Sequence, residues 1–301
     1  MGHHHSHPQP EKNLRLAFFL NLGFTILEIA GGLYTNSIAI LSDALHDLGD
    51  SIALGISYFL ERKSKKGGDS KYSFGYRRFS LLGALLNSIL LLVGAGIVLW
   101  HAVPRIFNPQ PTKVEGMIIL ALIGIAVNGF AFLKLRKTSS LNMKAAALHL
   151  LEDVMGWMAV LVVSIVLLFW KAFVLDALLS IGITLFILYN VVRNLRHTLK
   201  IFLQGVPEHL DIRQIENIIN SIPKVISTHH THIWTMDGEH HILTSHIVVA
   251  DGTSKEDVFR IKEKTREAMT QLKIDHLTLE VEFPEEDCLM REEHCGEAHS
   301  H

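Results

Sequence analysis

The chain has 301 residues, a mass of 33.8 kDa and a formal net charge of −2, and 49% of its residues are hydrophobic. It contains no basic stripe with interleaved aromatic residues, which excludes the usual pattern of a nucleic-acid-binding protein. The only cysteines are Cys288 and Cys295, so a disulfide framework is excluded as the support of the fold.

A histidine-rich segment opens the chain, and we assign residues 1–12 to it as a tail. Its run "HHHSH" is broken by Ser6, which favours a native tail over the alternative of an expression tag. The apolar run that follows is too long for the hydrophobic part of a cleavable signal peptide. We therefore expect that run to be retained as a membrane helix.

Six apolar stretches follow, each close to the ~20 residues that an α-helix needs to cross a bilayer. They occupy residues 14–34, 37–60, 79–101, 114–135, 143–170 and 172–192. The pattern predicts an all-α transmembrane domain of six helices over residues 13–204.

Lysine and arginine gather on one side of these stretches. Seven of them lie between the second and third stretches, and others lie before the first, after the fourth and after the sixth. The loops of the opposite side contain only Arg105, Lys113 and Lys171. By the positive-inside rule, both termini are expected in the cytoplasm. Short loops without an organelle signal favour a bacterial inner membrane.

The second stretch carries charged residues in "SDALHDLGDS" at residues 42–51. Asp43, His46, Asp47 and Asp50 have the spacing i, i+3, i+4, i+7, so they share one helix face. Asp43 and Asp47 lie one step from the pair His46 and Asp50. We expect them to line an aqueous entry or to hydrogen-bond the pair, with plain solvation at a cavity mouth as the alternative.

The fifth stretch carries "HLLED", in which His149 again precedes Asp153 by four residues. Four residues rise by ~6 Å along a helix, so both side chains of each pair can reach one point beside it. Two facing pairs supply two imidazoles and two carboxylates, a complete tetrahedral set for Zn²⁺.

A hydrogen-bonded packing role is the alternative for any one of these residues alone. An ionised group at the middle of a bilayer costs ~2.5 to 3.5 kcal/mol, so two matching pairs point instead to a bound cation or proton. Metal ligands must be deprotonated, so metal and protons compete for such a site and their movements become coupled. Because no nucleotide-binding P-loop is present, ATP is not the expected energy source.

Two further acids lie in apolar stretches. Glu28 in the first stretch is a candidate for moving protons or cations, against the alternative of hydrogen bonding between helices. Asp176 lies near the non-cytoplasmic start of the sixth stretch, and we expect it to face water.

The C-terminal part, residues 205–284, has the pattern helix, strand, strand, helix, strand. In its last strand, Leu277, Leu279 and Val281 alternate with polar residues. This order predicts a small α/β sandwich with helices on one face of a sheet. Residues 285–301 form a Cys/His-rich tail.

At these residues the chain resembles the cation diffusion facilitator (CDF) family of zinc-transporter-type metal/proton antiporters. The resemblance covers nearly the whole chain and includes "SDALHDLGDS", "KYSFGYRRFSLLGALLNSILLL", "HLLEDVMGW" and "HHTHIW". It implies that His46, Asp50, His149 and Asp153 form the transport site. It also implies six helices, a cytoplasmic ferredoxin-like domain and a homodimer.

The resemblance carries two statements about metal. A histidine at position 46 is associated with zinc preference in this family. Some relatives have a further metal site in the loop after the second helix, but the loop here has Asp69 and no histidine, so we expect that site to be missing.

A cytoplasmic metal site is implied as well. The positions that bind metal in some relatives, where the metals help to close the dimer, match His229, His232, His246, Glu280 and Glu282. In the tail, reduced thiolates beside histidine suit zinc, which makes Cys288, His294 and Cys295 candidates. The alternative is that these groups only solvate the surface, with the tails as loose collectors of metal.

The function that these patterns favour is secondary active transport. Zn²⁺, with Cd²⁺ or Co²⁺ as further substrates, would leave the cytoplasm in exchange for protons by alternating access, and a regulatory Zn²⁺ is a further expectation. A membrane metallohydrolase is one alternative, but the H-E-x-x-H motif that would supply a general base is absent. A membrane-anchored metal sensor is another, and it leaves the intramembrane pairs unexplained.

Overall fold

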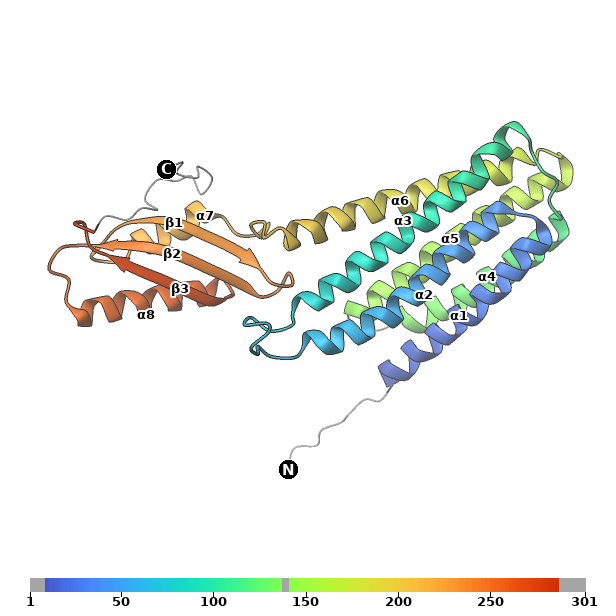
Figure 1. Cartoon of the computed structure of the whole chain (residues 1–301). Helices are drawn as coiled ribbons and strands as arrows, with labels where there is room; N and C mark the ends of the chain where they lie inside the picture. Colours follow the sequence, from blue (N-terminus) through green and yellow to red (C-terminus); the bar gives the residue numbers. More distant parts are fainter. Residues whose placement is uncertain (1–8, 137–140, 287–301) are drawn as a thin grey trace, which may run out of the picture. The chain divides into compact units, whose positions relative to one another are not determined.

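The computed structural model describes residues 9–136 and 141–286, which form six long helices followed by two shorter helices and three strands (Figure 1). The long helices are α1 (Gln9–Thr35), α2 (Ile38–Ser64), α3 (Arg78–Phe107), α4 (Val114–Leu135), α5 (Leu141–Phe169) and α6 (Val174–Phe202). After them come α7 (Ile212–Asn220), β1 (Val225–Thr235), β2 (His241–Val249), α8 (Lys255–Gln271) and β3 (Ile274–Glu282). Residue contacts divide the chain into a helical unit, Met1–Leu60 with Gly83–Leu195, and a second unit, Glu61–Leu82 with Arg196–His301.

Four helices in the described part of the chain are long and apolar enough to cross a membrane. They are α3, α4, the segment Ala147–Phe169 of α5, and α6, with mean hydropathies of 2.0 to 2.3. Leu22–Thr35 of α1 is a shorter apolar segment. Helix α2 carries three acids between its start and Asp50, and these charges lower its hydropathy. Large apolar side chains such as Trp100 and Phe169 are exposed on the helices, as expected for contact with lipid.

The core of the helical unit is built around Trp157 of α5, which is fully buried. Its ring meets Phe24 of α1 edge to face, with the ring centroids 5.5 Å apart. On α4, Gly124 makes room for the indole, because a Cβ at that position would lie 2.4 Å from a ring carbon of Trp157. A glycine therefore sets how closely α4 and α5 approach each other.

The start of α2 is fixed by a residue from α6. Asp176 is 1% exposed and accepts hydrogen bonds from the hydroxyl of Ser37 (2.5 Å) and the backbone N–H of Ile38 (2.8 Å). The expectation that Asp176 faces water is therefore wrong. The first N–H groups of a helix lack partners within that helix, and here a carboxylate from a neighbouring helix supplies the acceptor.

The turn between α1 and α2 is tied to α3 by Arg105. Its guanidinium donates to the backbone oxygen of Asn36 (2.7 Å) and to the Asn36 side-chain oxygen (2.9 Å). Asn36 has a φ of 56°, a left-handed conformation that asparagine tolerates better than most residues. Together with the bonds of Asp176, these bonds join α2, α3 and α6 at one end of the helical unit.

The second unit contains a three-stranded sheet of order β1-β2-β3, in which β1 and β2 are antiparallel and β2 and β3 are parallel. The predicted order of helices and strands is observed. Helices α7 and α8 share one core with the sheet, in which Ile219 and Ile261 pack with Leu243 and Ile247 of β2. His246 lies between these two β2 residues in the sequence, so it points to the opposite face.

The loop between α2 and α3 is ordered by Asp69. Its carboxylate accepts from the backbone N–H groups of Lys71 (2.9 Å) and Tyr72 (3.0 Å), from the Tyr76 hydroxyl (2.8 Å) and from Lys66 Nζ (3.0 Å). Bonds from Lys66 and Tyr76, in that order, lower the pKa of Asp69 well below its ordinary value. This carboxylate therefore has a structural role in the loop.

Candidate metal-transport site

Three of the predicted ligands meet where α2 faces α5. Oδ2 of Asp50 lies 3.7 Å from Nε2 of His46 and 3.4 Å from Nε2 of His149. The two imidazole rings meet edge to face, with centroids 5.8 Å apart. One ligand atom from each residue lies within 4.8 Å of the other two. Zinc bonds of ~2.0 to 2.2 Å in a tetrahedron separate neighbouring ligand atoms by ~3.3 to 3.6 Å, so the observed spacing suits a zinc ion.

The fourth predicted ligand, Asp153, lies on the other side of His149. Its Oδ1 is 4.0 Å from Nδ1 of His149, whereas Asp50 faces Nε2 of the same ring. Asp153 belongs with His149 and Asp47 to a second set whose ligand atoms lie within 4.8 Å of one another. The structure thus brings the four predicted residues together around His149, but as two overlapping groups.

The burial and the neighbours of Asp47 could not be predicted from its place on the α2 face. It was expected beside the ligands or at a solvated mouth, yet it is 1% exposed and within ligand distance of His149 and Asp153. The spacing in α2 shows only that Asp47 is on the same broad face. Which ligand group it joins depends on the rotation of α2 against α5, which has no signature in a local pattern.

Two more acids of the helical unit are buried near these groups. Glu28 of α1 is fully buried, and Asp43 of α2 is 7% exposed, with its carboxylate beside Gly156 of α5. Neither of these two acids belongs to a group of metal-ligand geometry among the described residues. They place two further carboxyl groups next to the ligands.

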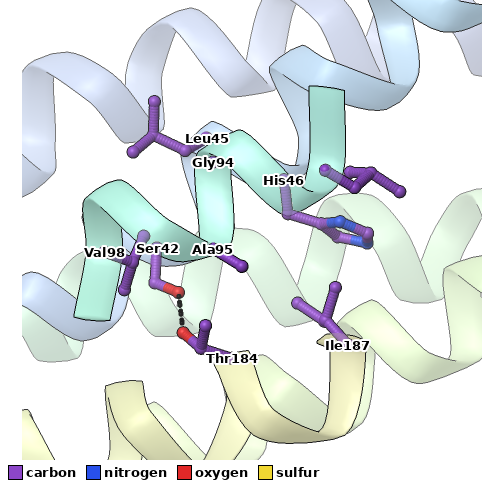
Figure 2. Close-up of a pocket in the computed structure, with 9 residues that line it drawn as sticks. Ser42, Leu45, His46, Gly94, Ala95, Val98, Thr184 and Ile187 are labelled. Atoms are coloured by element: carbon purple, nitrogen blue, oxygen red, sulfur yellow. Dashed lines mark hydrogen bonds between the residues drawn. The ribbon is translucent and has the colours of Figure 1, made fainter. Parts of the chain in front are cut away.

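His46 also lines a small cavity between α2, α3 and α6, shown in Figure 2. Its volume is about 20 Å³, enough for about one water molecule. Ser42 and Thr184 close one side through a hydrogen bond of 3.1 Å between their hydroxyls. Leu45, Ala95 and Val98 supply apolar walls, so His46 borders a mostly apolar space.

A second cluster lies on the sheet of the C-terminal unit, on the face opposite the core. Nδ1 of His246 is 2.5 Å from Oε1 of Glu282, and Nε2 of His229 is 3.4 Å from Oε2 of the same carboxylate. Pairing of β1 with β2 places His229 opposite His246. The three residues offer ligand atoms within 4.8 Å of one another. Glu282 is the shared partner of both imidazoles.

The other predicted residues of this cluster lie around it. Glu280 reaches His246 Nε2 at 3.4 Å from an exposed position, whereas His232 packs against His230 with ring centroids 4.4 Å apart. His230 was missed by sequence reasoning, although it belongs to "HHTH". An irregularity in β1 between His229 and His232, where His230 has a φ of 48°, turns it toward His246.

His230, beside this cluster, favours its neutral form. Burial first, and then the charges of His232 and His246, lower the pKa of His230 below its ordinary value. A neutral imidazole has the lone pair that a metal needs. The remaining candidates, Cys288, His294 and Cys295, lie outside the described residues.

Comparison with known proteins covers both units. Residues 14–203 match the family model of the cation efflux transmembrane domain, and residues 207–283 match that of the cation efflux protein cytoplasmic domain. The chain is 30% identical to the zinc transporter ZitB of Pectobacterium atrosepticum over 98% of its own length and 92% of that protein.

Two further relatives are named for metal cations more broadly. The chain is 33% identical to the metal cation efflux system protein CzcD of Cupriavidus metallidurans, over 94% of its length and 90% of that protein. It is 30% identical to the cadmium, cobalt and zinc/H(+)-K(+) antiporter of Bacillus subtilis, over 94% of its length and 92% of that protein.

Proposed function

The chain belongs to the cation diffusion facilitator, or cation efflux, family of cation transporters, and we propose that it exports Zn²⁺ from the cytoplasm in exchange for protons. The family consists of transporters, so the protein is not an enzyme. The observation that carries the proposal is the meeting of His46 and Asp50 from α2 with His149 from α5.

Zinc is the proposed substrate because of the donor set. Two imidazoles and a carboxylate match its preference for nitrogen and oxygen ligands in a tetrahedral arrangement. Cd²⁺ and Co²⁺ accept similar ligands, and relatives are named for all three metals. Imidazoles bind metal only when neutral, so protons compete with zinc for His46 and His149. That competition is the proposed basis of the exchange.

Alternating access is the proposed mechanism. Among the possible metal ligands, His46, Asp50 and His149 are partly exposed, whereas Asp47 and Asp153 are buried. One part of the site is therefore more accessible than the other. Movement of α2 against α5 would change which membrane face reaches these ligands. The hydrogen bonds of Asp176 and Arg105 at the start of α2 would have to rearrange when that end opens.

We further propose that all six long helices cross a bacterial inner membrane, with both termini in the cytoplasm. Residues 1–12 and 285–301 would be the two tails, residues 13–204 the transport domain, and residues 205–284 a ferredoxin-like domain. The strong basic bias of one set of loops supports this orientation. Two of the three acids that lower the hydropathy of α2, Asp47 and Asp50, belong to the groups of possible metal ligands, which explains a crossing helix of low apolarity.

The C-terminal unit is proposed to form a homodimer interface and to bind regulatory Zn²⁺ at His229, His246 and Glu282. The family model that matches residues 207–283 is named for dimer formation, which supports the proposed homodimer. The cluster geometry supports the second. His232, Glu280, Cys288, His294 and Cys295 remain additional proposed ligands of this unit and its tail.

Zinc flux into sealed proteoliposomes tests the proposal. The full chain should accumulate zinc when a proton gradient is imposed, and flux should fall at least ~10-fold in His46→Ala and Asp153→Asn. A chain that lacks residues 1–10 and 286–301 is the matched control and should keep most of its flux. Zinc flux that is the same with and without a proton gradient would contradict the proposal. Wild-type flux in His46→Ala would contradict it as well.

A further inference from the structure

The segment that joins α2 to α3 holds more cations than the structure pairs with acids. Residues 61–82 contain seven lysines and arginines but only two acids. Three of the seven form ion pairs, which are Lys65 with Glu61 (3.8 Å), Lys66 with Asp69 (3.0 Å) and Arg77 with Asp237 (3.7 Å). The other four have no carboxylate partner in the described part of the chain, and they are Arg62, Lys63, Lys71 and Arg78.

Lys63 is held in place by aromatic rings. Its Nζ lies 4.2 Å from the ring centroid of Phe79 and 5.8 Å from that of Tyr76. These two rings pack against each other and against Tyr72, with centroids 4.6 to 5.9 Å apart. A cation over an aromatic face is attracted to it, yet an ammonium keeps N–H donors for another partner. Lys63 is therefore a positioned cation that can still bind an anion.

Arg78 gives an independent sign of a missing acceptor. Its Nε is buried and has no hydrogen-bond partner among the described residues. Leaving a buried donor without an acceptor costs free energy, and a guanidinium matches a phosphate with two parallel N–H donors. Arg78 directly precedes Phe79, the residue under the Lys63 ammonium, so both cations belong to one corner of the segment.

The position of this corner along the chain selects the kind of anion. Helix α3 begins at Arg78 and is apolar enough to cross a membrane, with a mean hydropathy of 2.3, and Lys63 lies in the last turn of α2. The corner is thus at the level where lipid phosphates lie. Tyr72 is 45% exposed, and tyrosine is enriched at this level of a bilayer.

We propose that Lys63 and Arg78 bind the headgroup phosphate of an anionic phospholipid. Arg62 and Lys71 add further unpaired positive charge, which favours an anionic headgroup over a zwitterionic one. A bound lipid connects the end of α2 to the start of α3. The inference rests on the membrane crossing of α3 and does not depend on the proposed exchange of zinc for protons.

Competition for a fluorescent phosphatidylglycerol measures the binding. The full chain in detergent micelles should raise the anisotropy of the probe, and unlabelled phosphatidylglycerol should displace it. Phosphatidylcholine should compete at least ~10-fold more weakly, because its headgroup has no net charge. Inorganic phosphate at millimolar concentration should leave the probe bound, because it lacks the acyl chains. Added salt should weaken the binding.

Paired substitutions locate the site. Lys63→Gln and Arg78→Gln should each weaken phosphatidylglycerol binding by ~5-fold, the effect of one basic residue near an anionic surface. Lys65→Gln removes the same charge from a lysine that already has a carboxylate partner, so it is the matched control and should stay within ~2-fold of wild type. Lys63→Arg keeps the charge and should retain the affinity.

Phe79→Leu separates position from charge. It keeps every charge of the segment but removes the ring that holds Lys63, so binding should weaken by ~3-fold. Wild-type affinity in this variant would show that the ring does not position the ammonium and would contradict the site.

Three other results would overturn the inference. Equal competition by phosphatidylcholine would remove the selectivity for anionic lipid, and displacement by inorganic phosphate would make this a site for free anions. An equal loss in Lys65→Gln and Lys63→Gln would reduce the effect to general surface charge. None of these measurements involves zinc, so a failure of the proposed transport and a failure of lipid binding are distinguishable.

Discussion

Single carboxylates contact two histidines at both candidate metal sites. In the helical unit, Asp50 places one oxygen between the Nε2 atoms of His46 and His149. In the C-terminal unit, Glu282 uses its two oxygens for His246 and His229. A carboxylate between two imidazoles keeps both rings oriented before an ion arrives, which lowers the ordering needed upon binding.

Asp176 is a residue whose loss should be measurable without any metal. Asp176→Asn removes the charge that accepts from Ser37 and from the backbone of Ile38, both of them buried. Hydrogen bonds to a buried charged group contribute ~1.5 to 3 kcal/mol, so the free energy of unfolding should fall by about this amount. Thermal unfolding in detergent measures the change.

The control for this prediction is Glu115→Gln. Glu115 is an exposed acid in the first turn of α4, a helix other than the two that Asp176 joins. Its replacement should alter stability by no more than ~0.5 kcal/mol. If both variants melt at the wild-type temperature, Asp176 does not hold the start of α2.

His241 should make the C-terminal unit sensitive to acid. The side chain is 2% exposed, and its ring lies 4.9 Å from that of His209. Burial first, and then the charge of His209, lower the pKa of His241 below its ordinary value of 6.5. The unfolded chain therefore takes up this proton more readily than the folded chain. Stability from this group is complete above pH 6.5 and is lost as the pH falls from there toward the folded pKa.

The variant His241→Gln cannot take up the proton, so its melting temperature should fall less than that of wild type between pH 7.5 and pH 5.5. His276→Gln, which changes an exposed histidine of β3, should keep the wild-type dependence. Differential scanning fluorimetry at matched ionic strength measures both slopes. Parallel slopes in wild type and His241→Gln would contradict the assignment.

The pairs His46 with Asp50 and His149 with Asp153 could be predicted because each pair is local to one helix. Residues four apart lie on one face whatever the rest of the fold does. The grouping of Asp47 with Asp153 and the burial of Asp176 depend instead on how two distant helices rotate and approach each other. Contacts between distant helices leave no periodic pattern in the sequence. The sequence therefore identified the candidate residues but not which of them contact each other.

At the scale of helices, the approach of α4 to α5 should control the site from a distance. Gly124→Ala would place a Cβ 2.4 Å from the ring of Trp157, which is fully buried and cannot move aside freely. Overpacking of this kind costs ~1 to 3 kcal/mol. We expect a lower melting temperature and a several-fold slower zinc flux, because α5 carries His149 and Asp153.

Gly129→Ala is the matched control on the same helix. A Cβ there would have Val154 Cγ2 as its nearest neighbour at 4.0 Å, an ordinary contact. This variant should keep the wild-type free energy of unfolding within ~0.5 kcal/mol and the wild-type flux within about twofold. Equal behaviour of the two variants would show that Gly124 does not set the distance between α4 and α5.

The order of helices and strands could be predicted from the periodicity of apolar residues. The irregularity in β1 could not. The alternation in β3 and the apolar repeat of α7 determined the predicted order of the C-terminal unit. The irregularity at His230 was invisible, because a register shift arises from pairing between β1 and β2. The expected fifth apolar stretch began at residue 143, and α5 begins at Leu141, a difference typical of helix ends.

For the whole molecule, the number of membrane crossings separates two arrangements. The described part of the chain has four helices of clear transmembrane character, and the proposed function requires α1 and α2 to cross as well. Four and six are both even numbers of crossings, so the C-terminus lies on the same side of the membrane in both arrangements. The turn between α1 and α2 does, because it leaves the cytoplasm only if both helices cross.

Single cysteines at exposed positions decide between the two. In a Cys288→Ser and Cys295→Ser background, which has no other cysteine, Tyr34→Cys reports on that turn and Gln110→Cys on the loop between α3 and α4. Both should react with a membrane-impermeant maleimide in intact cells. Lys71→Cys, in the loop between α2 and α3, should react only in inverted vesicles.

If all six helices cross and both termini are cytoplasmic, positions 34 and 110 lie on the non-cytoplasmic side and are labelled from the same side. The basic loop that contains position 71 lies in the cytoplasm. Labelling of Tyr34→Cys only in inverted vesicles, with Gln110→Cys still labelled in intact cells, would leave α3 to α6 as the crossing helices. The ligands of α2 would then lie outside the bilayer, and the cost that makes intramembrane His46 and Asp50 informative would no longer apply.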